Sequence, residues 1–482
     1  MVTTNQRQAL LMIWDGLRPD MITPERTPHL ARLAAEGTRF TDSHAVIPTV
    51  TRCNSASIAT GALPSSHGIP GNTFYAPAVD PTQALTAGNA AALRAWAKVR
   101  GGPLLDRPTL ADRVHRAGGR SAIVSTGSTG SAFLQHPNVD ACGDLLFNPS
   151  IWAGMSQEDV EARIGAMPPG SMPNTEQNAW FTRLITDILL PEVKPRFISF
   201  WHTDPDRTQH DCGIGQPETL RSLGDADRNL GAMLTALERL DLRGSTDVVV
   251  TSDHGFSTII GHVDVSDALI RAGLKDSTDS VDVVVTGGAI YVPGSDSTRI
   301  GRIVQVLQEL KGVGPIFRNV RGARLEGTGT LPLGCVGVDG ALAPDVLYSN
   351  DWSNEANEYG HPGSAWSGPT SKAATHGSIS PWDVRNSLVA AGPSFKHGLV
   401  SAVPAGNVDI TPTLLHTLGL PLTDDLDGRL LSEALVDGPS PDSITVDRSV
   451  LAAESEHGRF KQWVQISKVD RTRYVDFGWV ER

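Results

Sequence analysis

The chain has little cysteine and no arrangement of cysteines that would form a framework. Its 482 residues include four cysteines, Cys53, Cys142, Cys212 and Cys335, which are widely spaced and form no CxxC pair. This spacing argues against a set of disulfides and against a structural zinc site. Free thiols in a reducing compartment are the simpler interpretation.

Long apolar runs and an excess of basic residues are also missing. No apolar run approaches a membrane span and the first residues show no signal sequence, so we expect a cytoplasmic protein without a membrane span. Acidic residues outnumber basic ones by 53 to 41, giving a formal charge of −12. That balance argues against binding to nucleic-acid polymers or anionic membranes. Phosphate esters can still bind if cations reverse the local field. The sequence does not indicate an oligomeric state.

The apolar residues that are present follow an α/β pattern. The chain is 40% hydrophobic, enough for an ordinary core, and residues 9–14 form a continuous apolar run typical of a strand covered on both faces. Expected helices precede expected strands at 109–117 and 121–125, at 175–190 and 197–201, and at 218–240 and 247–251. This alternation predicts a mostly parallel sheet with its functional site at the carboxyl ends of the strands.

One stretch departs from this alternation. Residues 281–292 and 299–310 predict a strand and a helix, but residues 322–372 are rich in glycine, serine and asparagine and show little periodicity. We expect long loops there, in a smaller inserted cap. The predicted division is a catalytic core of residues 1–256 and 376–482, with residues 257–375 as the cap or substrate region. The core resumes with a strand at 387–391, a helix at 410–418 and a hairpin at 462–479.

Residues able to bind metals follow several of the expected strands. Asp15 follows the first strand, Asp206 and His210 follow the strand at 197–201, and Asp253 and His254 end the run at 246–255. Parallel strands bring their carboxyl ends to one edge of a sheet, so we expect these side chains to meet. Asp206 and His210 are four residues apart and would lie on the same side of a helical turn.

Mixed carboxylate and imidazole ligands suit Zn²⁺, or Mn²⁺, better than Mg²⁺ or Ca²⁺. A further histidine, His376, stands in Ala374-Thr-His-Gly377. Taken singly, each of these residues has a commoner structural role in turns and caps. As a set they predict a centre for two metal ions in a hydrolase.

A hydroxyl nucleophile is expected in the segment Pro48-Thr-Val-Thr-Arg-Cys-Asn54, which reads as a loop entering a helix near Thr51. The N-terminus of a helix favours bound phosphate, because its free N–H groups and its dipole attract anions. Two alternatives remain open from the residues alone. Thr49 or Thr51 could serve only as an N-cap, and Cys53 is a rival nucleophile that has no obvious histidine partner.

These motifs resemble the alkaline phosphatase superfamily, and within it the type I phosphodiesterase and nucleotide pyrophosphatase family. The resemblance covers residues 48–54, Ser66-His-Gly-Ile-Pro-Gly-Asn72, Ser252-Asp-His-Gly255, Thr375-His-Gly377 and Asp409-Ile-Thr-Pro-Thr-Leu414. Pro205-Asp-Arg-Thr-Gln-His210 is similar to the family's PDxxGH element, with Gln209 in place of glycine. The resemblance implies an alkaline-phosphatase-like α/β fold, with a mostly parallel sheet sandwiched by helices.

The resemblance also implies roles for individual residues. Thr51 is the expected nucleophile, and Asn54 is expected to donate a hydrogen bond to a phosphoryl oxygen. One zinc ion is expected on Asp15, Thr51, Asp253 and His254, and the other on Asp206, His210 and His376. The implied reaction is hydrolysis of a small phosphate diester through a covalent phospho-threonine.

Two departures bear on the substrate. Family members specific for nucleotides carry an aromatic residue after the nucleophile, where this chain has Arg52, and a second aromatic at the position of Trp201. We expect Trp201 to stack on substrate and Arg52 to contact an anionic group, although a solvated helix start is an equal reading of Arg52. Related monoesterases and phosphonate hydrolases carry a cation after the strand at 121–125. Residues 125–131 hold none, which favours diesters.

The sequence fits other functions less well. A phosphonate hydrolase or phosphomonoesterase of the same superfamily is the main alternative, with Arg52 supplying the missing cation. A sulfatase is disfavoured because no CxPxR-type segment is present. A catalytically silent metal-binding relative is disfavoured too, because all seven expected ligand positions hold residue types that can bind metal.

Overall fold

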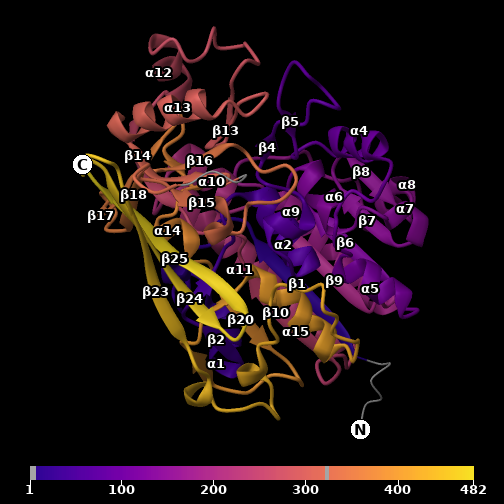
Figure 1. Ribbon diagram of the computed structural model, residues 1–482. Coiled ribbons are helices and arrows are strands. Elements are labelled where there is room, and N and C mark those ends of the chain that lie inside the picture. The colour runs from indigo at the N-terminus through magenta and orange to yellow at the C-terminus, as the bar shows by residue number, and fades with distance from the viewer. Residues whose placement is uncertain (1–6, 321–324) are drawn as a thin grey trace.

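The core of the molecule is a nine-stranded sheet that is parallel through its centre (Figure 1). The computed structural model describes residues 7–320 and 325–482. Five central strands are parallel, in the order β10, β1, β9, β6 and β7, while β20 runs antiparallel to β10 and β8 antiparallel to β7. In sheet order the strands are β21 (Leu399–Ser401), β2 (Thr38–Phe40), β20 (Leu388–Ala391), β10 (Thr246–Thr251), β1 (Gln8–Trp14), β9 (Phe197–His202), β6 (Ser121–Ser125), β7 (Leu145–Asn148) and β8 (Ile151–Ala153).

Helices cover both faces of this sheet, because the central strands are apolar on both sides. Leu10, Met12 and Trp14 of β1 belong to one buried cluster, with α1 (Pro28–Glu36), α9 (Thr175–Arg183) and α11 (Pro217–Arg239). The intervening Leu11 and Ile13 belong to another, with α2 (Thr51–Thr60), α5 (Leu110–Arg116) and α15 (Ile410–Thr417). The predicted fold class is confirmed: a mixed α/β fold with a mostly parallel central sheet between helices.

The predicted helices and strands of the core match the observed ones closely. One difference lies in the helix expected at 175–190, which continues beyond α9 as a π-helix over Leu184–Val193. Shorter elements complete the core: β3 (Ser43–His44), α3 (Pro64–His67), β4 (Thr73–Phe74), β5 (Leu85–Thr86), α4 (Ala90–Arg100), α6 (Thr129–Gln135), α7 (Val139–Cys142), α8 (Gln157–Ile164), α10 (Asp206–Cys212), α14 (Pro381–Val384) and β22 (Ala405–Gly406).

The region predicted as a cap contains two small sheets. One consists, in sheet order, of β17 (Trp352–Ala356), β18 (Pro362–Ser367), β11 (Ser257–His262) and β19 (Ala374–Thr375). The other orders β12 (Val284–Thr286), β13 (Ala289–Tyr291), β16 (Val346–Asn350), β14 (Val313–Arg318) and β15 (Leu331–Pro332), and it lies with α12 (Val265–Arg271) and α13 (Ser297–Glu309) at the top of Figure 1. The division of the chain at 257 and 375 stays a prediction.

The expectation of long loops over residues 322–372 was wrong where short strands form. Residues 322–324 lie outside the described part, and β15, β16, β17 and β18 occupy fewer than half of the remaining residues. Their partners are distant in sequence: β16 pairs with β13 and β14, and β18 pairs with β11. Because short strands of this kind gain their stability from distant partners, local periodicity does not reveal them.

The C-terminal hairpin is confirmed, with a third strand added. β24 (Lys461–Val469) pairs with β25 (Thr472–Glu481) and with β23 (Asp447–Glu454), and the three run down the left side of Figure 1. Phe460 and Val480 pack against the apolar cluster formed by α13 and β14. Among the described residues, no helix has both the length and the apolar character needed to cross a membrane.

Candidate functional site

The ligand-type residues predicted from the sequence meet at the carboxyl ends of three neighbouring strands. Asp15 directly follows β1, Asp206 begins α10 just after β9, and Asp253 and His254 follow β10. Because β10, β1 and β9 are adjacent and parallel, these side chains reach one edge of the sheet. His376 arrives from a different direction, directly after β19 of the smaller sheet.

Two overlapping groups of ligand atoms result. The first group consists of Asp206, His210 and His376, and the second of Asp15, Asp206 and His254. Within each group, one ligand atom from each residue lies within 4.8 Å of the others. Asp253 Oδ2 lies 3.0 Å from His254 Nε2 and so adjoins the second group. The structure thus brings together all the predicted carboxylate and imidazole ligands, and it places Asp206 between the two predicted sets.

Each of the three histidines presents its Nε2 to the centre. Nδ1 of His210, His254 and His376 lies 2.8–2.9 Å from a backbone carbonyl, of Ala374, Gly255 and Thr49 respectively. A carbonyl only accepts, so each Nδ1 carries a proton, and Nε2 is the ring nitrogen that faces the other ligands. Hydrogen bonds of this kind orient histidines that bind metals.

The carboxylates retain oxygens that no hydrogen-bond donor satisfies. Asp15 Oδ1, Asp206 Oδ1 and Asp253 Oδ2 are buried and have no hydrogen-bond partner among the described residues. Buried oxygens of this kind are costly unless a cation neutralises them. The donor set and its unpartnered oxygens therefore fit divalent metal ions.

The electrostatics of the site lead to the same conclusion. Burial raises the pKa of Asp15 well above its usual range, Asp253 and Asp206 raise it further, and the positive charge of Arg52 acts in the opposite sense. Burial, together with His254 and His210, holds the pKa of His376 well below its usual value. A neutral imidazole and carboxylates crowded against one another are both ready to accept a dication.

A glycine allows the ligand loops to approach closely. Gly16 has φ of +71°, and a Cβ added there would lie 2.9 Å from the Phe256 ring and 3.2 Å from Cβ of Asp206. Its N–H donates to Asp253 Oδ1 at 3.0 Å. The turn after β1 therefore requires glycine, and that turn joins the Asp15 loop to the Asp253 loop.

Thr51 is the first residue of α2 and faces the same centre. Its Oγ1 lies 3.4 Å from His254 Nε2, and the residue is 4% exposed. The N-cap is Val50, and no side-chain cap hydrogen bond is present, so the hydroxyl of Thr51 is free of the capping role. Cys53 is wholly buried, and burial raises the pKa of its thiol far above the usual value, so it does not suit the role of nucleophile.

Asn54 has a different environment from the one predicted. It is wholly buried, its Oδ1 accepts from Val46 N and Asn407 Nδ2, and its Nδ2 donates to the carbonyls of Pro48 and Val50. All its bonding capacity is used in holding the loop before α2. The predicted hydrogen bond to a phosphoryl oxygen therefore has no free donor on Asn54.

Asn72 is the amide that sequence reasoning missed. Its Oδ1 accepts from the backbone N–H of Arg52 at 2.9 Å, beside the first turn of α2. No hydrogen bond engages its Nδ2 within the described residues. The signal was present in the motif Ser66-His-Gly-Ile-Pro-Gly-Asn72, but only the folded chain shows that this loop returns to Thr51.

Trp201 is also placed differently from the prediction. It has no exposed surface, so a substrate ring cannot stack on it in this arrangement. Its indole N–H instead donates to Asp15 Oδ2 at 3.0 Å. Arg52, by contrast, is partly exposed, and its buried Nε has no hydrogen-bond partner among the described residues.

Replacing Trp201 with phenylalanine tests this contact. The ring stays buried but Asp15 loses its donor, and loss of such a hydrogen bond to a ligand costs roughly 10- to 100-fold in metal affinity. We expect Trp201→Phe to weaken zinc binding by about that factor in a chelator competition titration. Trp180→Phe is the matched control, because buried Trp180 donates to the Gly165 carbonyl elsewhere. Equal zinc affinity in the two variants would contradict the assignment.

The fold and the site define an α/β protein with a cluster of potential metal ligands at the carboxyl edge of its sheet. Comparison with known proteins gives the family. The sequence profile of the type I phosphodiesterase / nucleotide pyrophosphatase family matches residues 9–321. The chain belongs to that family, as the motifs predicted.

Individual relatives are distant in sequence. Venom phosphodiesterase 2 of Crotalus adamanteus is 25% identical over 261 residues, which is 53% of this chain and 27% of that protein. The chain thus spans about a quarter of the venom enzyme's length. The bis(5′-adenosyl)-triphosphatase ENPP4 of Bos taurus is 23% identical over 418 residues, 85% of this chain and 78% of that one.

Solved structures share the fold. Human ectonucleotide pyrophosphatase / phosphodiesterase 5 superposes with a TM-score of 0.62 at 16% identity, over 89% of this chain and 100% of that one. An inactive threonine-to-alanine variant of the murine protein, in complex with AMP, superposes with a TM-score of 0.58 at 16% identity, over 86% of this chain and 96% of that one.

Proposed function

We propose that this protein is a two-metal hydrolase of phosphate diesters, of the phosphodiesterase and nucleotide pyrophosphatase type, acting through a covalent phospho-threonine. The observation that carries the proposal is the position of the Thr51 hydroxyl, 3.4 Å from His254 Nε2, at a cluster of carboxylates with unpartnered oxygens. Family membership supports a hydrolase of this general class.

The division of the residues between two zinc ions follows the family resemblance, and the two groups of ligand atoms support it. Asp15, Thr51, Asp253 and His254 would hold one ion, and Asp206, His210 and His376 the other, with Mn²⁺ as an alternative metal. When bound, such ions lower the pKa of a coordinated hydroxyl and stabilise negative charge on phosphoryl and leaving oxygens. The unpartnered oxygens of Asp15, Asp206 and Asp253 support this assignment.

The remaining chemistry belongs to the side chains. Thr51 Oγ attacks phosphorus, the bond from phosphorus to the leaving oxygen breaks, and water then cleaves the phospho-threonine and restores the hydroxyl. Asn72, whose Nδ2 has no hydrogen-bond partner among the described residues and whose Oδ1 accepts from Arg52 N, would donate to a phosphoryl oxygen in place of Asn54. Trp201 keeps Asp15 oriented through its indole N–H.

The surroundings of Thr51 favour a diester, and the relatives favour one with a nucleotide part. The loop of residues 125–131 lies against α2, where Ser55 Oγ donates to the carbonyl of Ser131, and it carries no cation to match a second phosphate charge. Relatives also point to nucleotides, through the AMP complex of the murine protein and the name of the bovine triphosphatase. We therefore propose nucleotide diesters or pyrophosphates as the substrate class.

Arg52 supports the second candidate, a phosphonate hydrolase or phosphomonoesterase. It follows Thr51 directly, its charge reaches Asp15 and His376, and its Nε is unpartnered. A guanidinium so placed suits a substrate with an additional negative charge.

A comparison of two chromogenic esters separates these candidates. With reconstituted zinc, kcat/KM for bis-p-nitrophenyl phosphate should exceed that for p-nitrophenyl phosphate by about tenfold or more, because residues 125–131 carry no cation to offset the second charge of the monoester. Arg52→Ala should widen this preference by lowering the monoester rate more than the diester rate. A wild-type preference for the monoester would overturn the diesterase proposal.

A further inference from the structure

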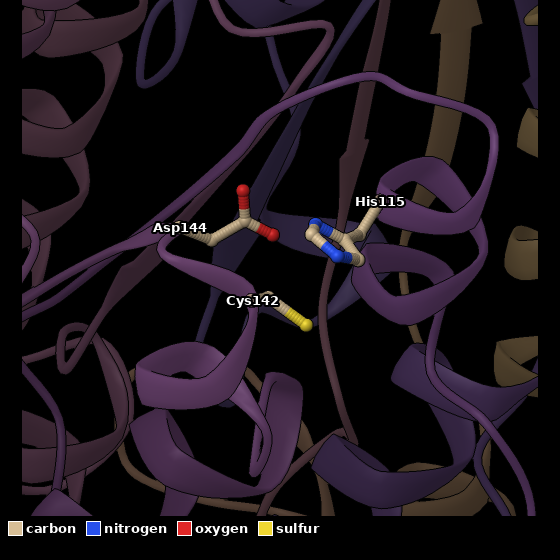
Figure 2. A group of neighbouring side chains, drawn as sticks. All are labelled: His115, Cys142 and Asp144. Carbon is tan, nitrogen blue, oxygen red and sulfur yellow. The ribbon is translucent and has the colours of Figure 1, made fainter.

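A second group of metal-ligand side chains lies away from the proposed catalytic centre. His115 is in the last turn of α5, Cys142 ends α7, and Asp144 stands directly before β7. One ligand atom from each lies within 4.8 Å of the other two. Figure 2 shows the three side chains pointing toward one another. Asp144 precedes its strand, whereas the catalytic residues follow theirs, so the two groups lie at opposite ends of the parallel strands.

The local sequence explains why these side chains converge. α5 begins with a capping box in which Thr109 Oγ1 accepts from Asp112 N and the Asp112 carboxylate accepts from Thr109 N. α7 ends at Gly143, whose φ of +66° is left-handed and turns the chain after Cys142. Cys142 and Asp144 therefore lie on either side of a tight turn that faces the end of α5.

Asp144 is already fixed in a position suited to a ligand. It is 1% exposed, its Oδ1 accepts from Ser121 N at 3.1 Å, and its Oδ2 lies 2.9 Å from His136 Nε2. Each carboxylate oxygen has two lone pairs, so both can accept again. Hydrogen bonds of this kind hold a carboxylate in place and favour its coordination to a metal. His115 is exposed and Cys142 partly so, which leaves a path to solvent.

The charge around the group is unbalanced. A second carboxylate, Asp112, lies close by, with its Oδ1 3.6 Å from His136 Nδ1. Within residues 7–320 and 325–482, Asp112 and Asp144 form ion pairs with His136 alone. A divalent cation bound here would offset the two carboxylate charges and stabilise the Cys142 thiolate.

Another cluster of ligand-type side chains in the molecule differs from the His115 group in its charge balance. Ligand atoms of Asp42, His44 and Asp476 also lie within 4.8 Å of one another. There, however, Asp42 Oδ1 is 2.8 Å from Arg385 and Asp42 Oδ2 is 3.5 Å from Arg448. Arginine already neutralises that cluster, so it is a structural ion-pair network. The His115 group has no arginine or lysine in such an ion pair within the described residues.

We propose that His115, Cys142 and Asp144 bind one zinc-type divalent ion, with water completing the coordination, as a site that ties α5 to α7. Thiolate, imidazole and carboxylate together select a borderline-soft metal over Mg²⁺ or Ca²⁺. In a tetrahedral site the ligand atoms are roughly 3.3–3.8 Å apart. The ligand atoms lie within 4.8 Å of one another, so the side chains would close on the ion, and the exposed ring of His115 has room to move.

Cobalt is the probe that tests this site. A thiolate bound to Co²⁺ gives an intense charge-transfer absorption in the near ultraviolet, and the proposed catalytic ligands are all nitrogen and oxygen. Full-length protein saturated with Co²⁺ should show this absorption and bind one more ion per chain than Cys142→Ser, which should lose the band. Cys212→Ser is the control, because Cys212 is also a free, partly buried cysteine, and it should keep both.

His115→Ala provides a second measurement that does not depend on the thiol. It alters an exposed side chain and should weaken Co²⁺ binding at this site by at least tenfold, with the band appearing only at higher cobalt concentration. Absence of the band in the wild type, or its persistence in Cys142→Ser, would overturn the proposal. Hydrolysis of bis-p-nitrophenyl phosphate should remain in both variants, so failure of this site and failure of the diesterase proposal are distinguishable.

Discussion

Thr51→Ala should lower kcat for bis-p-nitrophenyl phosphate by about 10⁴-fold while leaving the fold intact. Removing a nucleophile removes the covalent route altogether, and losses of this order are typical of covalent hydrolases. The hydroxyl of Thr51 makes no side-chain cap hydrogen bond, so its removal should change the free energy of unfolding by less than about 1 kcal/mol. Steady-state rates and thermal melts with zinc at saturation measure the two effects.

Two neighbouring substitutions serve as controls. Thr51→Ser retains a hydroxyl and should recover a measurable part of the rate. Thr49→Ala should behave in the opposite way to Thr51→Ala, because Thr49 Oγ1 donates to the Ser378 carbonyl at 2.7 Å and accepts from Gly377 N at 3.1 Å. Its loss should cost about 1–2 kcal/mol of stability with much of the rate retained. A Thr51→Ala protein that keeps more than a tenth of the wild-type kcat would exclude Thr51 as nucleophile.

Most carboxylates and imidazoles of the centre could be predicted because they follow strands of the central sheet, whereas His376 follows a strand of the smaller sheet and was predicted from its motif. Asp15 and Asp253 follow apolar strands, and parallel strands place such residues at one edge whatever the length of chain between them. The alternation of helices with strands then gave the fold class. These inferences need only the order of elements along the chain.

The roles of Asn54 and Trp201 could not be predicted in the same way. Each occupies a position where the family pattern suggests contact with substrate, but burial depends on what packs against it from elsewhere. Asn407, distant in sequence, donates to Asn54 Oδ1. Trp201 is enclosed within a core cluster and bonded to Asp15. Asn72 was not predicted, although it lies beside the first turn of α2. Its approach to Arg52 depends on the path of a loop, which the sequence alone does not give.

Metal removal should have the second large effect, on activity and on stability together. A chelator that strips the ions of the proposed catalytic centre should lower diesterase activity by at least about 100-fold, and Zn²⁺ should restore it. Ligands that bind only the folded state stabilise it by about 3–4 kcal/mol at 100 to 1,000 times their dissociation constant. The melting temperature should therefore fall on chelation by roughly the few degrees that such a change produces in a large domain.

Asp206→Asn distinguishes a metal centre from a cluster that is merely acidic. Asp206 lies between the two groups of ligand atoms, and its charge helps to raise the pKa of Asp15. With zinc present, the variant should be less stable than the wild type because it loses a ligand to the bound ion. After chelation the order should reverse, because neutralising one carboxylate relieves repulsion that no cation then offsets. Melting curves of both proteins, with and without zinc, give this sign directly. If the stability difference keeps the same sign in both conditions, Asp206 does not bind metal there.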